Sequence, residues 1–291
     1  MHRYKLKFNI ARSYPELFHI LKAALEIKNF FKSLWQKYLL RKFKRMQVIN
    51  LSNNLKIKIS RENGYIDEQI FLSREWSHGL INTLLENVRS DSIVLDVGAN
   101  IGYMTLHLSQ KCLDGHVYSF EPVRSLYEQL QTNVEINNFE NNCTLLNIAL
   151  GNVNEAGAVL KNTKNMGMSS IVRSEKVSSE NENIIIKKLD SIDLNVENID
   201  LIKVDVEGFE YEFLKGAEKT IKNHMPILVI EYSPALLSSD EQHDLVEFLY
   251  KMGYKIYDVR SGSRYKDLEC FPFDALQLLG QTDLLCKPPR K

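Results

Sequence analysis

Hydrophobic positions in the middle of this chain form short runs that are apolar at almost every residue. Such runs predict strands that are buried on both faces, as in a mainly parallel sheet covered by helices. Helical stretches separate most of them, which indicates repeated strand–helix–strand units. The runs are SIVLDVG (92–98), HVYSFEP (116–122), TLLNIALG (144–151), IDLIKVDVEG (199–208) and PILVIEYSP (226–234).

Other rhythms flank this region. Residues 15–46 place Leu and Phe at near-helical spacing with lysines between them, and residues 73–88 are also predicted to be helical. Residues 47–60 alternate apolar and polar positions across a Ser-Asn-Asn turn, as a short hairpin does. Residues 151–190 favour short β segments joined by polar turns. Strand-like pieces in residues 254–288 would complete the sheet.

These elements predict an α/β fold with a doubly wound, mainly parallel sheet that has an antiparallel edge strand. Two domains are expected. Residues 1–46 form a basic, amphipathic helical N-terminal extension, and residues 47–291 form one globular domain.

The predicted extension and the predicted globular domain also differ in charge. Residues 1–50 hold 12 Lys and Arg against two acids, whereas the rest holds 25 against 35. The extension can therefore contact an anionic membrane surface, or it can pack on the domain with its charged face in water. Nucleic acid is not expected as a partner, because no recognition module accompanies the basic residues.

The expected location is the cytoplasm, including a peripheral position at the inner face of a membrane. No apolar run in the extension reaches the ~18 residues of a membrane span, and the first residues lack signal-peptide features. The four cysteines have neither zinc-like nor disulfide-like spacing, which favours a reducing compartment.

The stretch VLDVGANIGYMT (94–105) joins a predicted strand to a predicted helix through a glycine turn. Gly98 and Gly102 allow backbone to approach a ligand, and the amides that open the helix can donate to it. Glu121 ends the next strand, where a carboxylate can accept hydrogen bonds from both hydroxyls of a ribose. The sequence therefore predicts a nucleotide-like ligand at this turn.

The details of the turn favour one ligand class. Asn100 and Tyr103 occupy the second and third glycine positions of a dinucleotide fingerprint, and there is no Walker lysine. Asp96 ends the first strand and suits a cationic head group. S-adenosylmethionine carries an ammonium and a sulfonium, so the turn indicates a methyltransferase.

The string KVDVEGFE (203–210), together with VLDVGANIGYMT, SFEP, NIALG and PILVIEYSP, resembles the FkbM family of S-adenosylmethionine-dependent methyltransferases. The resemblance covers about residues 65–260. It implies a class I methyltransferase (Rossmann-like) fold with strand order 3-2-1-4-5-7-6. It also implies S-adenosylmethionine as cofactor and O-methylation of a hydroxyl on a sugar or a secondary metabolite.

The resemblance further implies roles for individual residues. Glu121 would bind the ribose, and Glu75 would meet the methionine ammonium or serve as an acid at a helix N-terminus. The remaining cofactor-binding positions form the loop and the adenine edge, and they are Asp96, Gly98, Asn100, Gly102, Asn147 and Ala149.

An acidic group after the fourth strand is the candidate for catalysis. Asp205 and Glu207 can act as a base or bind the acceptor hydroxyl, and Lys203, two positions before Asp205, can moderate their charge. Alternatively, Glu207 and Glu210 are acids favoured at the start of a helix. Asp205 and Glu231 could hold a cation, but their spacing does not require one, so no metal is predicted.

The function expected from these features is S-adenosylmethionine-dependent O-methylation of a hydroxyl group, on a glycan or a lipid-linked saccharide. Residues 165–172 (NMGMSSIV) are expected to form part of the acceptor pocket. Two alternatives stay open. The acceptor could be a small secondary metabolite, or the chain could be a binding module that keeps the fold without catalysis.

Overall fold

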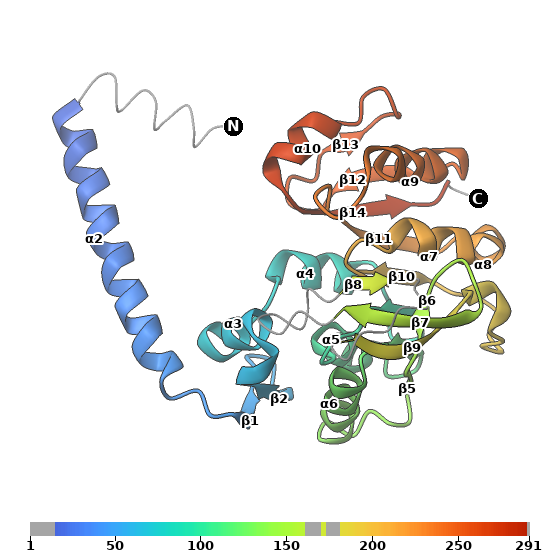
Figure 1. Cartoon of the computed structure of the whole chain (residues 1–291), viewed down its shortest axis with the longest axis horizontal. Helices are drawn as coiled ribbons and strands as arrows, with labels where there is room; N and C mark the ends of the chain where they lie inside the picture. The colour runs from blue at the N-terminus through green and yellow to red at the C-terminus, as the bar shows by residue number, and fades with distance from the viewer. Residues whose placement is uncertain (1–14, 161–169, 173–180, 290–291) are drawn as a thin grey trace. The chain divides into compact units, whose positions relative to one another are not determined.

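The computed structural model describes residues 15–160, 170–172 and 181–289 (Figure 1). The chain forms two compact units, Met1–Arg45 and Met46–Lys291. We call the second unit the body.

The first unit contains the helix α2 (Pro15–Leu40). Its described side chains from residue 27 onward are mostly exposed, including aromatic ones. In the described part of the chain, no helix combines the length and the apolar character that crossing a bilayer requires.

The described residues of the body contain an eight-stranded sheet in the order β13-β12-β14-β11-β10-β3-β4-β5. From β5 to β12 this order corresponds to the expected 3-2-1-4-5-7-6, and β13 adds one short strand at the edge. In sheet order the strands are Arg264–Tyr265, Lys255–Asp258, Thr282–Lys287, Ile227–Tyr232, Leu201–Val204, Ile93–Val97, His116–Phe120 and Cys143–Leu146.

Strands β5, β4, β3, β10 and β11 are parallel. The edge strand β13 is antiparallel to its neighbour β12, as expected. A second antiparallel strand, β14, lies inside the sheet between β11 and β12. Its burial alternates along the strand, so the local sequence pattern resembles that of an edge strand although both of its sides are paired.

Helices cover both faces of this sheet. α5 (Tyr103–Lys111) and α6 (Arg124–Glu135) connect β3 to β4 and β4 to β5, so this half of the sheet grows from β3 toward β5. α7 (Glu210–Gly216), α8 (Glu218–His224) and α9 (Ser239–Lys251) belong to the other half, which grows from β10 through β11 toward β12. Because parallel crossovers are right-handed, the two sets lie on opposite faces. The core between these layers includes Leu130, Phe213 and Leu245, all fully buried.

A hairpin and two short helices precede the sheet. β1 (Met46–Asn50) and β2 (Lys56–Ser60) pair antiparallel, which confirms the predicted hairpin. A 3₁₀ turn follows, and then α3 (Tyr65–Ser73) and α4 (His78–Glu86). The helix predicted over residues 73–88 begins only at residue 78. Arg74 and Ser77 have left-handed φ values of 62° and 46°, which interrupt the helical path.

A smaller sheet in the described residues has the order β6-β9-β7-β8, and it confirms the β segments predicted after residue 151. The predicted strand TLLNIALG is split in two. Asn147 donates to the carbonyl oxygens of Glu121 and Pro122, and the chain then leaves the central sheet. The strands are β6 (Ala149–Leu150), β7 (Glu155–Leu160), β8 (Ser170–Val172) and β9 (Asn181–Lys187). The remaining described elements are a 3₁₀ turn at Leu189–Ser191 and α10 (Phe273–Leu279).

Candidate active site

A cavity of about 520 Å³ lies at the carboxyl ends of β3, β4, β10 and β11. Strand order reverses between β3 and β10, and in doubly wound sheets this edge forms the ligand crevice. The volume is within the range of small-molecule sites. Residues from the small sheet, including β6, and from the turn before α4 line other parts of its wall.

Gly98 brings the loops after β3 and β10 into contact. Its φ is 78°, and a Cβ at this position would lie 1.8 Å from the carbonyl oxygen of Asp205. The Asp205 amide in turn donates to the carbonyl oxygen of Val97 at 3.1 Å. Only glycine allows this approach. We call residues 98–102 the glycine loop and residues 205–210 the acidic loop.

The backbone amides of the glycine loop have hydrogen-bond acceptors within the protein. The amides of Gly98 and Ala99 both donate to the carbonyl oxygen of Phe120 at 3.0 Å. The Ile101 amide donates to Asn100 Oδ1, and the Gly102 amide donates to the Ala99 carbonyl. These bonds hold residues 98–102 in a fixed shape. The amides predicted to serve a ligand are those that open α5, and that prediction is not tested by these bonds.

Glu121 ties the glycine loop to β4 and lines the cavity. Its side chain is 4% exposed, and its two oxygens accept the amides of Asn100 at 2.8 Å and Val123 at 2.9 Å. Each carboxylate oxygen keeps a further lone pair for a ligand hydroxyl. Burial raises the pKa of Glu121 to about 7, although the two amides lower it.

Asp96 does not line the cavity. It is fully buried under the glycine loop, where Oδ2 accepts a hydrogen bond from Thr105 at 2.6 Å. Its Oδ1 lies 3.4 Å from the Lys203 ammonium. The predicted cofactor residue is thus part of the support beneath the loop. The side chain of a residue near the end of a β-strand can point to either face of the sheet. The local sequence does not show which face it takes.

Three other predicted residues are also outside the lining. A Cβ at Gly102 would lie 2.4 Å from Leu130, so this glycine permits packing of α5 on α6. Glu75 is in the turn between α3 and α4 and accepts from Ser52. Asn147 holds the carbonyls after β4. Ala149 does line the cavity, as do Gly98 and Asn100.

Carboxylates from the acidic loop and from β11 gather in the same cavity, next to the glycine loop. Asp205, Glu207 and Glu231 each offer an oxygen within 4.8 Å of the other two, and we call them the carboxylate cluster. The Lys203 ammonium donates to the Gly98 carbonyl at 2.9 Å and lies 3.4 Å from Asp205. Burial alone lowers the pKa of Lys203, but Asp205 and Asp96 outweigh it and raise the pKa above its usual value.

The two glutamates of the acidic loop have different environments. Glu207 has a left-handed φ of 50° and lines the cavity; burial, followed by Asp205 and Glu210, raises its pKa to about 8. Glu210 is fully buried at the start of α7 and accepts the amides of Val206 and Gly208. For Glu210 the helix-start alternative is confirmed.

Several wall residues escaped the sequence analysis. Tyr65 and Trp76 line the cavity with their rings edge to face at 5.8 Å, and Tyr103 accepts the Trp76 amide. Gln281, the residue before β14, donates to Glu231. No local signal identifies them, because they come from distant segments that only the fold assembles. Of the predicted acceptor segment, residues 165–169 lie outside the described residues, and Ile171 lines the cavity.

The fold and the site together define a class I methyltransferase. The model of the methyltransferase FkbM domain matches residues 96–256, which is more than half of the chain. The chain belongs to the FkbM methyltransferase family, and the resemblance seen in the sequence is confirmed.

Curated relatives agree with this assignment. Methyltransferase sdnD of Sordaria araneosa is 26% identical over 165 residues, which cover 46% of this chain and 64% of the relative. Hexuronic acid methyltransferase AglP of Haloferax volcanii is 28% identical over 148 residues, covering 50% and 57%. The chain thus matches less than two thirds of the length of either relative.

A solved methyltransferase FkbM from Methylobacillus flagellatus is 21% identical. The match covers 75% of this chain and 52% of that chain with a TM-score of 0.48. As expected for the family, the cofactor is S-adenosylmethionine. The cavity fits it, because Glu121 presents free lone pairs for ribose hydroxyls and Ile148 and Ala149 form an apolar wall suited to adenine.

Proposed function

We propose that this methyltransferase acts on a hydroxyl oxygen of a saccharide, within a glycan or linked to a lipid. The observation that carries the proposal is that one cavity is lined both by the glycine loop with Glu121 and by the carboxylate cluster. A hydroxyl must lose its proton as it attacks a methyl group. The carboxylates that line the same cavity are suitable acceptors for that proton.

The cofactor-binding residues are Gly98, Asn100, Glu121 and Ala149. Glu121 accepts hydrogen bonds from the ribose, and the apolar wall near Ala149 receives the adenine ring. S-adenosylmethionine, when bound, supplies the activated methyl group. The rigid glycine loop orients it toward the carboxylate cluster.

On the acceptor side, Asp205 and Glu207 bind the hydroxyl and draw its proton away. The Lys203 ammonium lies 3.4 Å from Asp205 and helps to hold that side chain in place beside the acceptor. Holding the acceptor oxygen about 3 Å from the methyl group supplies much of the rate acceleration in such a displacement.

Two observations support a saccharide. Tyr65 lines the cavity while remaining 53% exposed, and with Trp76 it offers an aromatic surface in the cavity that the carboxylates also line. A sugar ring has both an apolar face and hydroxyls. The relative AglP is named a hexuronic acid methyltransferase.

The test is methyl transfer by the purified full-length chain to a panel of saccharides, lipid-linked saccharides and small hydroxylated metabolites. S-adenosylhomocysteine release reports turnover, and NMR of the product locates the new methyl group. Glu207→Gln is expected to lower kcat about 10²- to 10⁴-fold. The matched control Glu218→Gln alters an exposed residue of α8 and should leave kcat unchanged. Methylation of nitrogen or carboxyl groups alone, or full activity in Glu207→Gln, contradicts the proposal.

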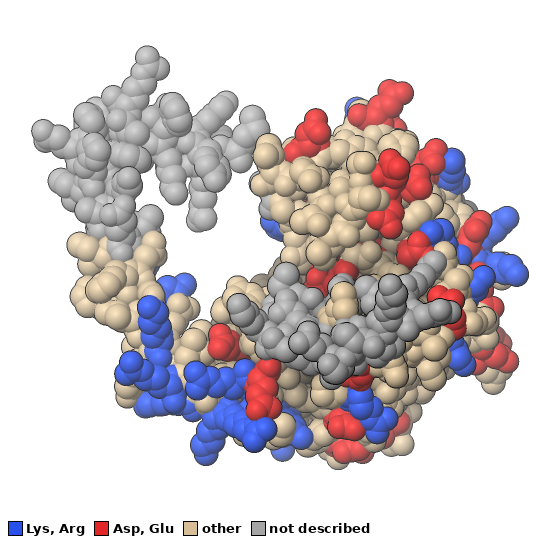
Figure 2. Space-filling view, in the orientation of Figure 1, with Lys and Arg blue, Asp and Glu red and all other residues tan. Residues whose placement is uncertain are grey.

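We also propose that α2 binds an anionic membrane surface at the cytoplasmic face. Phe31 is 64% exposed and Trp35 is 62% exposed, and such rings favour the bilayer interface. Basic residues that can meet anionic headgroups lie along α2 and in the residues that follow it. The exposed ones are Lys28, Lys32, Lys37, Arg41, Lys42, Lys44 and Arg45 (Figure 2). All four cysteines are free, which supports a reducing compartment.

Flotation of the full-length chain tests this second proposal. We expect it to float with phosphatidylcholine vesicles that contain phosphatidylserine and not with phosphatidylcholine alone. The double variant Phe31→Ser/Trp35→Ser should lose most of the binding. Leu113→Ser, which changes a 63% exposed apolar residue of the body, is the control. Equal flotation of wild type and double variant overturns the proposal.

A further inference from the structure

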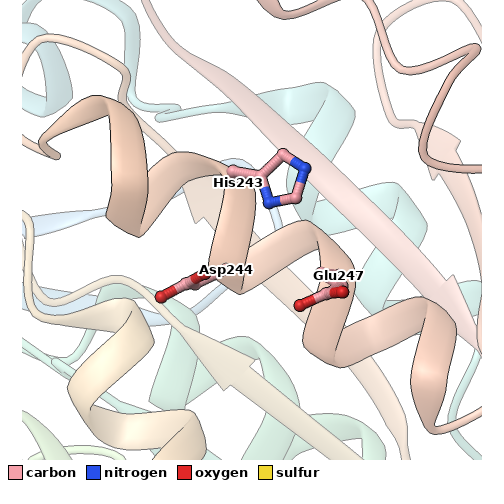
Figure 3. Close-up of side chains that lie close together, drawn as sticks. All are labelled: His243, Asp244 and Glu247. Atoms are coloured by element: carbon pink, nitrogen blue, oxygen red, sulfur yellow. The ribbon is translucent and has the colours of Figure 1, made fainter.

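Two groups of metal-ligating side chains in the described part of the chain come close enough to share a cation. The first, His243, Asp244 and Glu247, projects from α9 alone (Figure 3). His243 is exposed and stacks on Phe273, and Glu247 pairs with Lys251 at 2.9 Å. These groups already have protein partners, so this surface group supports no site.

The carboxylate cluster is different because it lies inside the cavity. Asp205 and Glu207 come from the acidic loop, and Glu231 comes from β11. Their oxygens lie within 4.8 Å of one another. Oxygen ligands placed about 2.0–2.6 Å from one Mg²⁺ or Ca²⁺ are separated by no more than about 5 Å. The three side chains can therefore share a cation with little movement.

Glu231 provides a second, independent observation. Its side chain is 5% exposed, and Oε2 has no hydrogen-bond partner. A buried carboxylate oxygen without a partner is costly, since a buried charge requires a counter-charge or a metal. Glu231 lines the same cavity as the other two acids, so a ligand in that cavity would satisfy it.

The local charge balance points the same way. The Lys203 ammonium lies 3.4 Å from both Asp96 and Asp205 and is shared between them. Neither Glu207 nor Glu231 forms an ion pair with a described residue. The one ammonium at the site is thus engaged by Asp96 and Asp205, and the carboxyl groups of Glu207 and Glu231 are left without a cationic partner among the described residues.

We propose that Asp205, Glu207 and Glu231 bind one divalent cation of the oxygen-preferring class, Mg²⁺, Mn²⁺ or Ca²⁺. Carboxylates with no histidine or thiolate among them select such hard ions. The role of the ion rests on the proposed function. At this position it would hold the acceptor hydroxyl oxygen and favour its ionised form.

Calorimetric titration of the chelator-stripped, full-length chain with MgCl₂, MnCl₂ and CaCl₂ tests the site without any acceptor. One saturable site is expected for at least one ion, with a matching rise in Tm. Glu231→Gln and Glu207→Gln should each weaken binding about tenfold or more, because each removes a charged ligand. His243→Ala and Glu218→Gln should bind as the wild type does.

No saturable binding by the wild type overturns the proposal, and so does binding that survives both cluster variants or is lost in His243→Ala. Methyl transfer assays separate this outcome from the proposed function. Hydroxyl methylation that persists undiminished in excess chelator overturns the role of the cation and leaves O-methylation intact. Cation binding at the cluster without methylation of any hydroxyl supports the site and contradicts O-methylation.

Discussion

The glycine loop and the acidic loop are neighbours at the same edge of the sheet. They differ in whether the polar groups around them have hydrogen-bond partners. The amides of the glycine loop donate to the Phe120 carbonyl, to the Glu121 carboxylate and to acceptors within the loop. On the side of the acidic loop, Glu231 lines the cavity with one carboxylate oxygen that has no hydrogen-bond partner. The amides of the glycine loop therefore have partners before any ligand binds, whereas one carboxylate oxygen of Glu231 does not.

This difference indicates how the two halves of the site work. A loop with internally satisfied backbone keeps one shape, which suits a cofactor that is the same in every turnover. Unpaired buried carboxylates raise the free energy of the ligand-free state and favour binding of a partner that satisfies them. Four predictions test this contrast, in order of decreasing effect.

Replacing Gly98 should break the contact between the loops. In Gly98→Ala the new Cβ would lie 1.8 Å from the Asp205 carbonyl oxygen, at a φ of 78°. We expect a loss of about 4–5 kcal/mol in the free energy of unfolding and loss of cofactor binding. Chemical denaturation and calorimetry measure the two effects. Gly262→Ala is the control, because φ there is 67° and nothing lies within 4 Å of the added Cβ. Equal stability of the two variants would refute the loop contact.

Lys203 joins the two loops, so Lys203→Met should destabilise both. It leaves Asp96 and Asp205 without their ammonium and removes the donor to the Gly98 carbonyl. Breaking a buried ion pair from one side leaves an uncompensated charge, and the expected loss is about 3 kcal/mol. The measurement is denaturant unfolding. An additional Asp205→Asn should recover part of the loss, and no recovery would mean that the pairing with Asp205 contributes little.

Glu121→Gln should affect cofactor binding, whereas a substitution in the carboxylate cluster should not. Loss of the carboxylate is expected to weaken S-adenosylmethionine binding about 10- to 100-fold, since hydrogen bonds to charged groups contribute about 1.5–3 kcal/mol each. Glu231→Gln, on the other wall, should change cofactor affinity less than about twofold, because additivity holds for sites without shared partners. Calorimetry compares the two variants directly, and equal losses would remove the distinction between the walls.

Cofactor affinity should also depend on pH through Glu121. Burial raises its pKa to about 7, and the ionised form is the better acceptor for ribose hydroxyls. Affinity should therefore rise about tenfold between pH 6 and pH 8, as the ionised fraction grows, and then level off. The same raised pKa makes the contribution of Glu121 to folding stability fall as the pH rises from 4.5 toward 7. If the cofactor affinity of Glu121→Gln still depends on pH in the same way, a group other than Glu121 causes the dependence.

Local sequence was sufficient for the main architecture. Fully apolar runs predicted the buried parallel strands, and alternation predicted the hairpin of β1 and β2. The family resemblance supplied the strand order. These features depend on burial and periodicity, which neighbouring residues alone reveal.

The direction of individual side chains could not be predicted in the same way. Asp96 supports the glycine loop from below, and Gly102 permits helix packing. Both were expected at the cofactor, because a motif gives position along the chain and not the face of the strand. Glu75 lies in a turn, since left-handed residues on either side of it interrupt the predicted helix.

The amino-acid order alone thus specified a doubly wound sheet, a glycine turn and an acidic string after its fourth strand. The carboxylate cluster required the folded chain, because Glu207 and Glu231 are separated by 24 positions and meet only through the pairing of β10 with β11. The same holds for Tyr65, Trp76 and Gln281, which reach the cavity from opposite ends of the body. Local periodicity encodes which face of an element is buried, whereas a site depends on distances between elements that only tertiary packing determines.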